Sequence, residues 1–188
     1  MIGLRLSVVL MSILCLPPAA ALAQDDAERM ARVLCLDDAE CLARAKHRLT
    51  ADTLRKMFAV DRELFTLMKE APELKGRMDE LATRIDPQRR LGDEIRTAQV
   101  LEGIPEIAQI LRTHRISGRE FMLTYSVAMV TAMADDSLTY EAQSEGRKEI
   151  PSALMTPALK FWRSMHPALK VEAAAWKKMR GYDQGLNR

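Results

Sequence analysis

The stretch SGREFMLTYSVAMVTAMADD, residues 117–136, decides the fold of this 188-residue chain. Ser117 and Glu120 have the spacing of a capping box, which satisfies backbone groups at a helix start. From Phe121 to Ala134 only one serine and two threonines interrupt the apolar residues. A helix that is apolar on every side has to be buried by its neighbours, and this one is too short to cross a bilayer. The sequence therefore predicts a buried central helix near residues 118–135.

Apolar residues recur at helical spacing along much of the remaining chain. We expect helices over residues 54–68, 74–85, 91–101 and 105–114. Their boundaries are indicated by residues that commonly start or stop helices: Thr50 or Asp52, Pro87, Gly103 and Pro105. No alternating run long enough for a strand occurs, and β-branched residues are sparse. The predicted fold is all-α, a compact helical bundle of about six to eight short helices.

The chain after the central helix divides into a polar segment and an apolar one. Residues 135–150 are polar and contain Gly146, so we expect an internal linker there. Residues 156–180 then form a predicted C-terminal helical arm. Pro167 should break this arm near His166, because proline disfavours helical geometry in the residue before it.

Apolar residues of the arm keep one helical stripe across the expected break. Such a stripe usually docks on the rest of a bundle, and large aromatic side chains usually serve the core. A second interpretation is a groove for a protein partner or an apolar ligand. The residues concerned are Phe161, Trp162, Met165, Leu169 and Trp176.

Residues 1–23 have the pattern of a secretory signal peptide. Arg5 is followed by an apolar run and then by small residues, with cleavage expected before Gln24. We expect residues 24–188 to form a single all-helical domain. Its formal charge would fall from +2 to +1 with the loss of Arg5. The protein would be periplasmic in a Gram-negative bacterium and secreted otherwise.

Two cysteines of the mature chain, Cys35 and Cys41, are predicted to form a disulfide, because exported proteins meet an oxidising compartment. A continuous helix would hold them too far apart, but Asp37 and Glu40 indicate a new helix start between them. The alternatives are a redox pair or a metal site that also includes His47.

The arm is locally basic, with seven lysines and arginines against two acids between residues 160 and 188. It could dock on the acidic residues near the N-terminus or contact anionic lipid, although a solvated helix face is the commoner role of such charges. The nearly neutral total charge predicts no nucleic-acid partner.

Asp61 interrupts the apolar stripe of the helix predicted over residues 54–68. One interpretation is a buried acid with a raised pKa. The preferred interpretation places the carboxylate at the margin of the stripe, in water, where acids usually lie.

No assembled set of catalytic residues can be recognised, so we expect no enzyme activity. The favoured hypothesis is a non-enzymatic helical protein that binds a protein partner or an apolar ligand, without a cofactor. The alternative is a haem- or metal-binding bundle that uses His47, His114 or His166 together with methionine.

Overall fold

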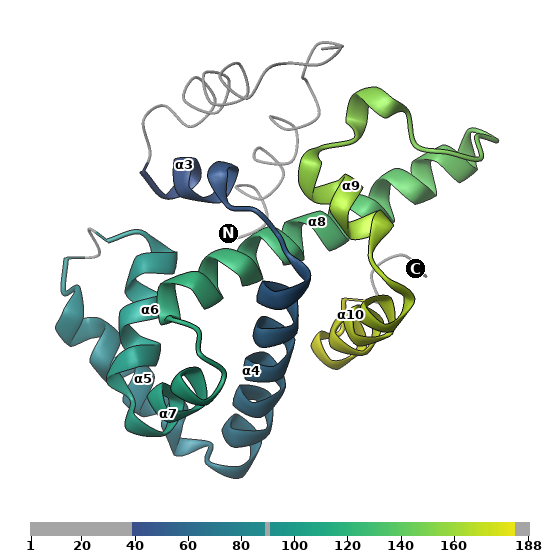
Figure 1. Ribbon diagram of the computed structural model, residues 1–188. Coiled ribbons are helices and arrows are strands. Elements are labelled where there is room, and N and C mark those ends of the chain that lie inside the picture. The colour runs from purple at the N-terminus through teal and green to yellow at the C-terminus, as the bar shows by residue number, and fades with distance from the viewer. Residues whose placement is uncertain (1–38, 89–90, 183–188) are drawn as a thin grey trace.

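The computed structural model describes residues 39–88 and 91–182 and is all-α, which confirms the predicted fold class (Figure 1). This part of the chain has eight α-helices, one 3₁₀ helix and no strand. In chain order they are α3 (Ala39–Lys46), α4 (Ala51–Glu70), α5 (Glu73–Ile85), α6 (Asp93–Gly103), α7 (Pro105–Thr113), α8 (Gly118–Ser144), η1 (Ser152–Leu154), α9 (Pro157–Ser164) and α10 (Pro167–Arg180). No helix of the described residues has both the length and the hydropathy needed to span a membrane.

Helix α8 crosses the middle of the molecule and packs against α3, α4, α6 and α9 (Figure 1). It begins where the sequence predicts, because the Ser117 side chain accepts a hydrogen bond from the Glu120 amide at 3.1 Å. No residue from 120 to 136 is exposed. The most deeply covered ones, such as Phe121, Thr124 and Ala128, recur at helical spacing. The predicted central helix is therefore confirmed.

The predicted linker over residues 135–150 is wrong for residues 135–144, which belong to α8, whereas residues 145–150 follow the helix. Leu138 and Ala142 are buried and lie four residues apart, so they extend the apolar stripe of α8 through a segment of polar composition. The helix ends at Ser144, and Gly146 terminates it with a left-handed φ of 70° that suits glycine. The Gly146 amide donates to the Gln143 carbonyl at 3.0 Å, and the Arg147 amide donates to the Ala142 carbonyl at 2.7 Å.

The connection after α8 turns back on the helix through a small apolar cluster. Ile150, Leu138 and Leu159 are buried against one another, with Leu154 and Met155 beside them. This cluster anchors the start of α9 to the second half of α8.

The C-terminal arm is divided as Pro167 predicts. Thr156 caps α9, since its Oγ1 accepts the Leu159 amide hydrogen bond at 3.2 Å. Met165 and His166 have extended backbone, which is the geometry that proline favours in the residue before it. Helix α10 then packs against α4, far earlier in the chain.

Helices α6 and α8 approach each other closely at Gly118. The Gly118 amide donates a hydrogen bond to Glu102 Oε1 at 2.6 Å, and this carboxylate lies at the positive end of α8. A Cβ atom at this position would stand 2.7 Å from the backbone oxygen of Ala98. The packing therefore requires glycine here.

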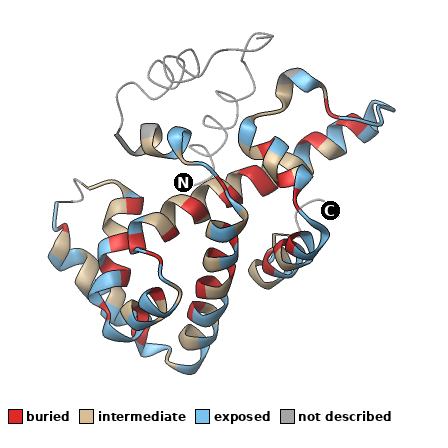
Figure 2. Ribbon diagram, viewed as in Figure 1, coloured by how far each residue is buried: buried red, intermediate tan, exposed pale blue. Residues whose placement is uncertain are grey.

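The main core joins α4, α5, α6, α7, α8 and both helices of the arm. Buried residues recur along α4 and α8, which Figure 2 shows in red. Leu54, Met57, Phe58 and Val60 of α4 have at most 1% of their surface exposed. Thr50 caps this helix and exchanges hydrogen bonds with Thr53.

Candidate functional site

Asp61 is buried and ion-paired, with only 1% of its surface exposed. Its Oδ2 accepts hydrogen bonds from Trp176 Nε1 at 2.8 Å and from Arg180 Nε at 2.7 Å, and its Oδ1 accepts one from Arg180 Nη2. The prediction that this carboxylate lies in water is therefore wrong. Its partners lie 115 and 119 residues further along the chain, where spacing within one helix gives no indication of them.

Aromatic rings surround this ion pair. The Trp176 ring centroid lies 5.5 Å from that of Phe58, 5.8 Å from that of Tyr125 and 5.5 Å from that of Tyr182. The hydroxyl groups of Tyr125 and Tyr182 are hydrogen-bonded to each other at 2.8 Å. Burial, together with this hydrogen bond, raises the pKa of Tyr125, so its hydroxyl stays neutral at physiological pH.

Arg180 lies between two of these rings, with its guanidinium carbon 5.5 Å from the Phe65 centroid and 5.7 Å from the Tyr125 centroid. Burial opposes its charge, but the hydrogen bonds and the charge of Asp61 outweigh this effect and raise the pKa of Arg180. Arg180 therefore stays charged, and α10 is fixed to α4 and α8 by one connected group of side chains.

An apolar groove of about 310 Å³ opens beside this pair. It lies among α4, α5, α6, α7 and α8, and Arg180 of α10 closes one side. Most of its surface is apolar, and its floor includes the buried side chains of Leu101 and Ile107. Three methionines and three aromatic residues give it its character: Met68, Met78, Met122, Phe65, Phe121 and Tyr125.

A second, more polar hollow of about 550 Å³ lies between α5 and α6. Its lining includes Asp79, Asp86 and Arg96. Met78 and Thr97 line both this hollow and the apolar groove, so the two are neighbours separated by these side chains.

The predicted groove of the arm is corrected by the structure. Trp162, Met165, Leu169 and Trp176 are all buried in the main core, and Phe161 packs against it half-buried. These residues therefore serve the domain's own packing. Trp176 contacts the lining of the apolar groove, through Asp61 and Tyr125.

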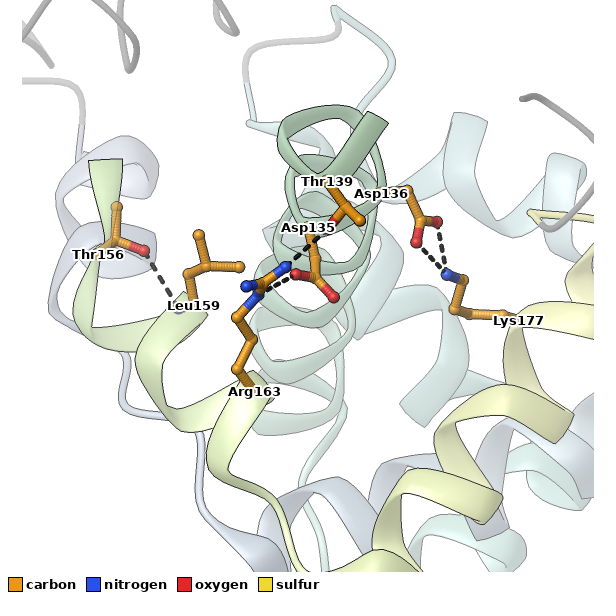
Figure 3. Close-up of polar contacts among 7 residues, drawn as sticks. All are labelled: Asp135, Asp136, Thr139, Thr156, Leu159, Arg163 and Lys177. Atoms are coloured by element: carbon orange, nitrogen blue, oxygen red, sulfur yellow. Dashed lines mark hydrogen bonds and ion pairs between the residues drawn. The ribbon is translucent and has the colours of Figure 1, made fainter. Parts of the chain in front are cut away.

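The basic side chains of the arm find acidic partners on the central helix (Figure 3). Arg163 Nε donates to Asp135 Oδ1 at 2.6 Å and its Nη2 donates to Thr139 Oγ1 at 2.7 Å. Lys177 Nζ donates to Asp136 Oδ1 at 2.6 Å. Three cations of the arm, counting Arg180, are thus neutralised by α8 and α4. Most of the acidic residues expected as their partner near the N-terminus lie outside the described residues.

The three histidines proposed as ligands do not converge. His47 Nε2 is hydrogen-bonded to Thr124 Oγ1 at 2.9 Å, and His114 Nε2 to Glu63 Oε1 at 2.7 Å. His166 Nδ1 accepts the Ala168 amide hydrogen bond at 3.3 Å. Within residues 39–88 and 91–182, no group of three or more His, Cys, Asp or Glu side chains is arranged to hold a metal ion.

The cysteine pairing stays a prediction. Cys41 lies half-buried on α3, and Cys35 lies outside the described residues.

Phe65 and Met68 belong to the helix predicted over residues 54–68, and their spacing within it gives no indication of a groove. They lie at its edge, and both stay half-buried. Two large apolar residues at the margin of the apolar stripe of α4 are the sequence feature that could have indicated an apolar groove. Arg180 lies 115 residues beyond Phe65 in the chain, and no sequence pattern indicates that it lines the same groove.

Together the fold and the site define a helical-bundle protein with an apolar, methionine-lined groove beside a buried ion pair. Comparison with family models, with curated proteins and with solved structures finds no match to this chain.

Proposed function

We propose that this is a non-enzymatic exported helical protein that binds an apolar group in its groove, carried by a protein partner or by a small apolar ligand. The observation that supports this proposal is the groove itself, whose lining is mostly apolar and holds three methionines and three aromatic residues. Its volume lies at the lower end of the range of about 300–1,000 Å³ that is typical of ligand sites.

The composition of the lining suits binding. Methionine is unbranched and polarisable, so it can adapt its shape to different apolar surfaces. Met68, Met78 and Met122 are only half-buried, which leaves part of each side chain available for contact. Phe121 and Leu101 form a buried, well-packed base beneath them.

The same geometry does not favour catalysis. Asp61 is the one carboxylate among the groove-lining residues. Its two oxygens accept three hydrogen bonds, and its charge is neutralised by Arg180. A general base needs a carboxylate that can take up a proton from a substrate, and this one is fully engaged.

The test is binding of the neutral apolar dye Nile red to the mature chain. A Met68→Trp substitution fills the groove and should abolish dye binding. Val171→Trp is the matched control, because it adds the same indole to α10 at a residue that is 70% exposed and remote from the groove lining. Equal dye binding by both variants and the wild type would contradict the proposal.

Export is proposed from residues 1–23. Expression of the full chain in a Gram-negative host, followed by N-terminal sequencing of the periplasmic fraction, should give a mature protein that begins at Gln24. A full-length chain retained in the cytoplasm would contradict export without bearing on the groove.

A further inference from the structure

Two cations contact Phe65, which is one of the residues that line the apolar groove. Lys69 Nζ lies 4.4 Å from the Phe65 ring centroid, and the Arg180 guanidinium carbon lies 5.5 Å from it. The ring is therefore flanked by two cations. Among the lining residues the only acid is Asp61, which is used by Arg180. The charges of Lys69, Arg180 and Asp61 sum to +1.

Both cations can still donate hydrogen bonds. Lys69 is exposed and forms no ion pair with any described residue. Arg180 uses Nε and Nη2 for Asp61, and its Nη1 has no hydrogen-bond partner in the described part of the chain. The arginine side chain is 28% exposed, so its outer edge is open to a ligand. A planar guanidinium and an ammonium group that contact the same ring are each suited to an anionic group.

We propose that the groove binds a single-chain fatty acid. Its apolar tail lies along Met68, Phe121 and Met122, and its carboxylate lies beside Phe65, between Lys69 and Arg180. The inference rests on the proposed function and names the ligand class. The small groove volume favours one unbranched chain over a lipid with two chains.

The test compares pairs of ligands that share a chain and differ in the head group. Octanoate and decanoate are titrated against octanol and decanol, below their aggregation limits, by calorimetry with the mature protein. The carboxylates should bind several-fold more tightly than the alcohols at low salt, and the difference should shrink as salt is added. Each added CH₂ should improve affinity about fourfold until the groove is filled.

Two lysine variants locate the head group. Lys69→Gln should weaken carboxylate binding about threefold and leave alcohol binding unchanged. Lys170→Gln is the matched control, because Lys170 is an exposed lysine on α10 without an ion pair among the described residues. It should leave both affinities unchanged. Both positions are exposed, and circular dichroism would verify that both variants fold.

The outcomes separate this inference from the proposed function. If acids and alcohols bind equally and Met68→Trp blocks both, the groove binds apolar groups and the fatty-acid inference fails. Equal losses in Lys69→Gln and Lys170→Gln would also overturn it. If neither ligand binds, or if Met68→Trp has no effect on binding, the proposed function itself fails.

Discussion

The helices α4 to α7 and the C-terminal arm of α9 and α10 are held in place by different interactions. The ion pairs of α4–α7 lie on the surface: in the pair of Arg77 with Glu106, both side chains are more than 40% exposed. The arm instead adds sheltered ion pairs to its apolar seam, through Arg163, Lys177 and Arg180. Sheltered pairs are screened less by water and salt, so they contribute more to position. The arm is thus placed by ion pairs as well as by apolar packing, whereas α4–α7 rely mainly on apolar contact.

The largest expected effect comes from breaking the buried pair at Asp61. Asp61→Ala leaves Arg180 without its carboxylate and the Trp176 N–H without its acceptor. Loss of one partner of a buried pair costs about 3–5 kcal/mol, and partial exposure of Arg180 favours the lower end of this range. Urea unfolding should therefore show a loss of about 3 kcal/mol.

The matched control is Glu172→Ala, which removes an acid from an exposed pair with Arg55 at 4.0 Å. It should cost less than about 1 kcal/mol. Equal losses in the two variants would show that burial of Asp61 contributes nothing and that the arm is not placed by charge.

Disturbing the close approach of α6 and α8 at Gly118 is expected to have the next largest effect. Gly118→Ala would place a methyl group 2.7 Å from the Ala98 carbonyl oxygen and 2.9 Å from Glu102, and the backbone oxygen cannot move aside as a flexible side chain can. Overpacking of this kind costs about 1–3 kcal/mol. Gly76→Ala is the control: a Cβ there meets nothing within 4 Å, so it should stabilise α5 by about 0.5–1 kcal/mol. Thermal unfolding would show shifts of opposite sign, and two shifts of the same sign would contradict the close approach of α6 and α8.

A structural feature can be predicted from this sequence when the residues that determine it are close together along the chain. Ser117, Thr156 and Pro167 act on their immediate neighbours, and the boundaries that they predict are confirmed. The predicted linker failed for a local reason, because polar composition concealed the stripe of Leu138 and Ala142.

The groove and the ion pair could not be predicted in this way. Asp61 meets Trp176 and Arg180 only after α10 has folded back on α4, and the groove lining comes from six helices. A single helix carries no information about which residue of another helix will neutralise its acid. Arg180 was counted in a basic patch, and Asp61 was placed in water, because each was considered without the other.

A smaller effect is expected when one charged contact of the arm is removed. Asp135→Ala leaves Arg163 with only its hydrogen bond to Thr139 (Figure 3). Both side chains of the Arg163–Asp135 pair are partly exposed, so the loss should be about 1 kcal/mol. Hydrogen exchange should become faster in α9 and stay unchanged in α4–α7. Glu141→Ala is the control, because Glu141 is an exposed residue of the same helix without an ion pair in the described residues. It should change neither the stability nor the hydrogen exchange of α9. Faster exchange throughout α4–α7 in Asp135→Ala would contradict a separate arm.

The smallest effect concerns His47, which joins the segment between α3 and α4 to the central helix through Thr124. Burial lowers the pKa of His47 from its usual 6.5, and nearby Glu120 opposes this shift only in part. The unfolded chain therefore takes up a proton at a higher pH than the folded one. The stability contributed by neutral His47 should be complete above about pH 6.5 and should be lost as the pH falls from there toward the folded pKa.

His47→Gln should flatten this part of the stability profile, as measured by urea unfolding between pH 5 and 8. His166→Gln, at an exposed helix cap, should keep the wild-type profile. An identical slope in the wild type and His47→Gln would show that the contact between His47 and Thr124 does not depend on the neutral ring. Helix α3 would then be held in place by its other contacts, such as the pair of Arg44 with Glu94 of α6.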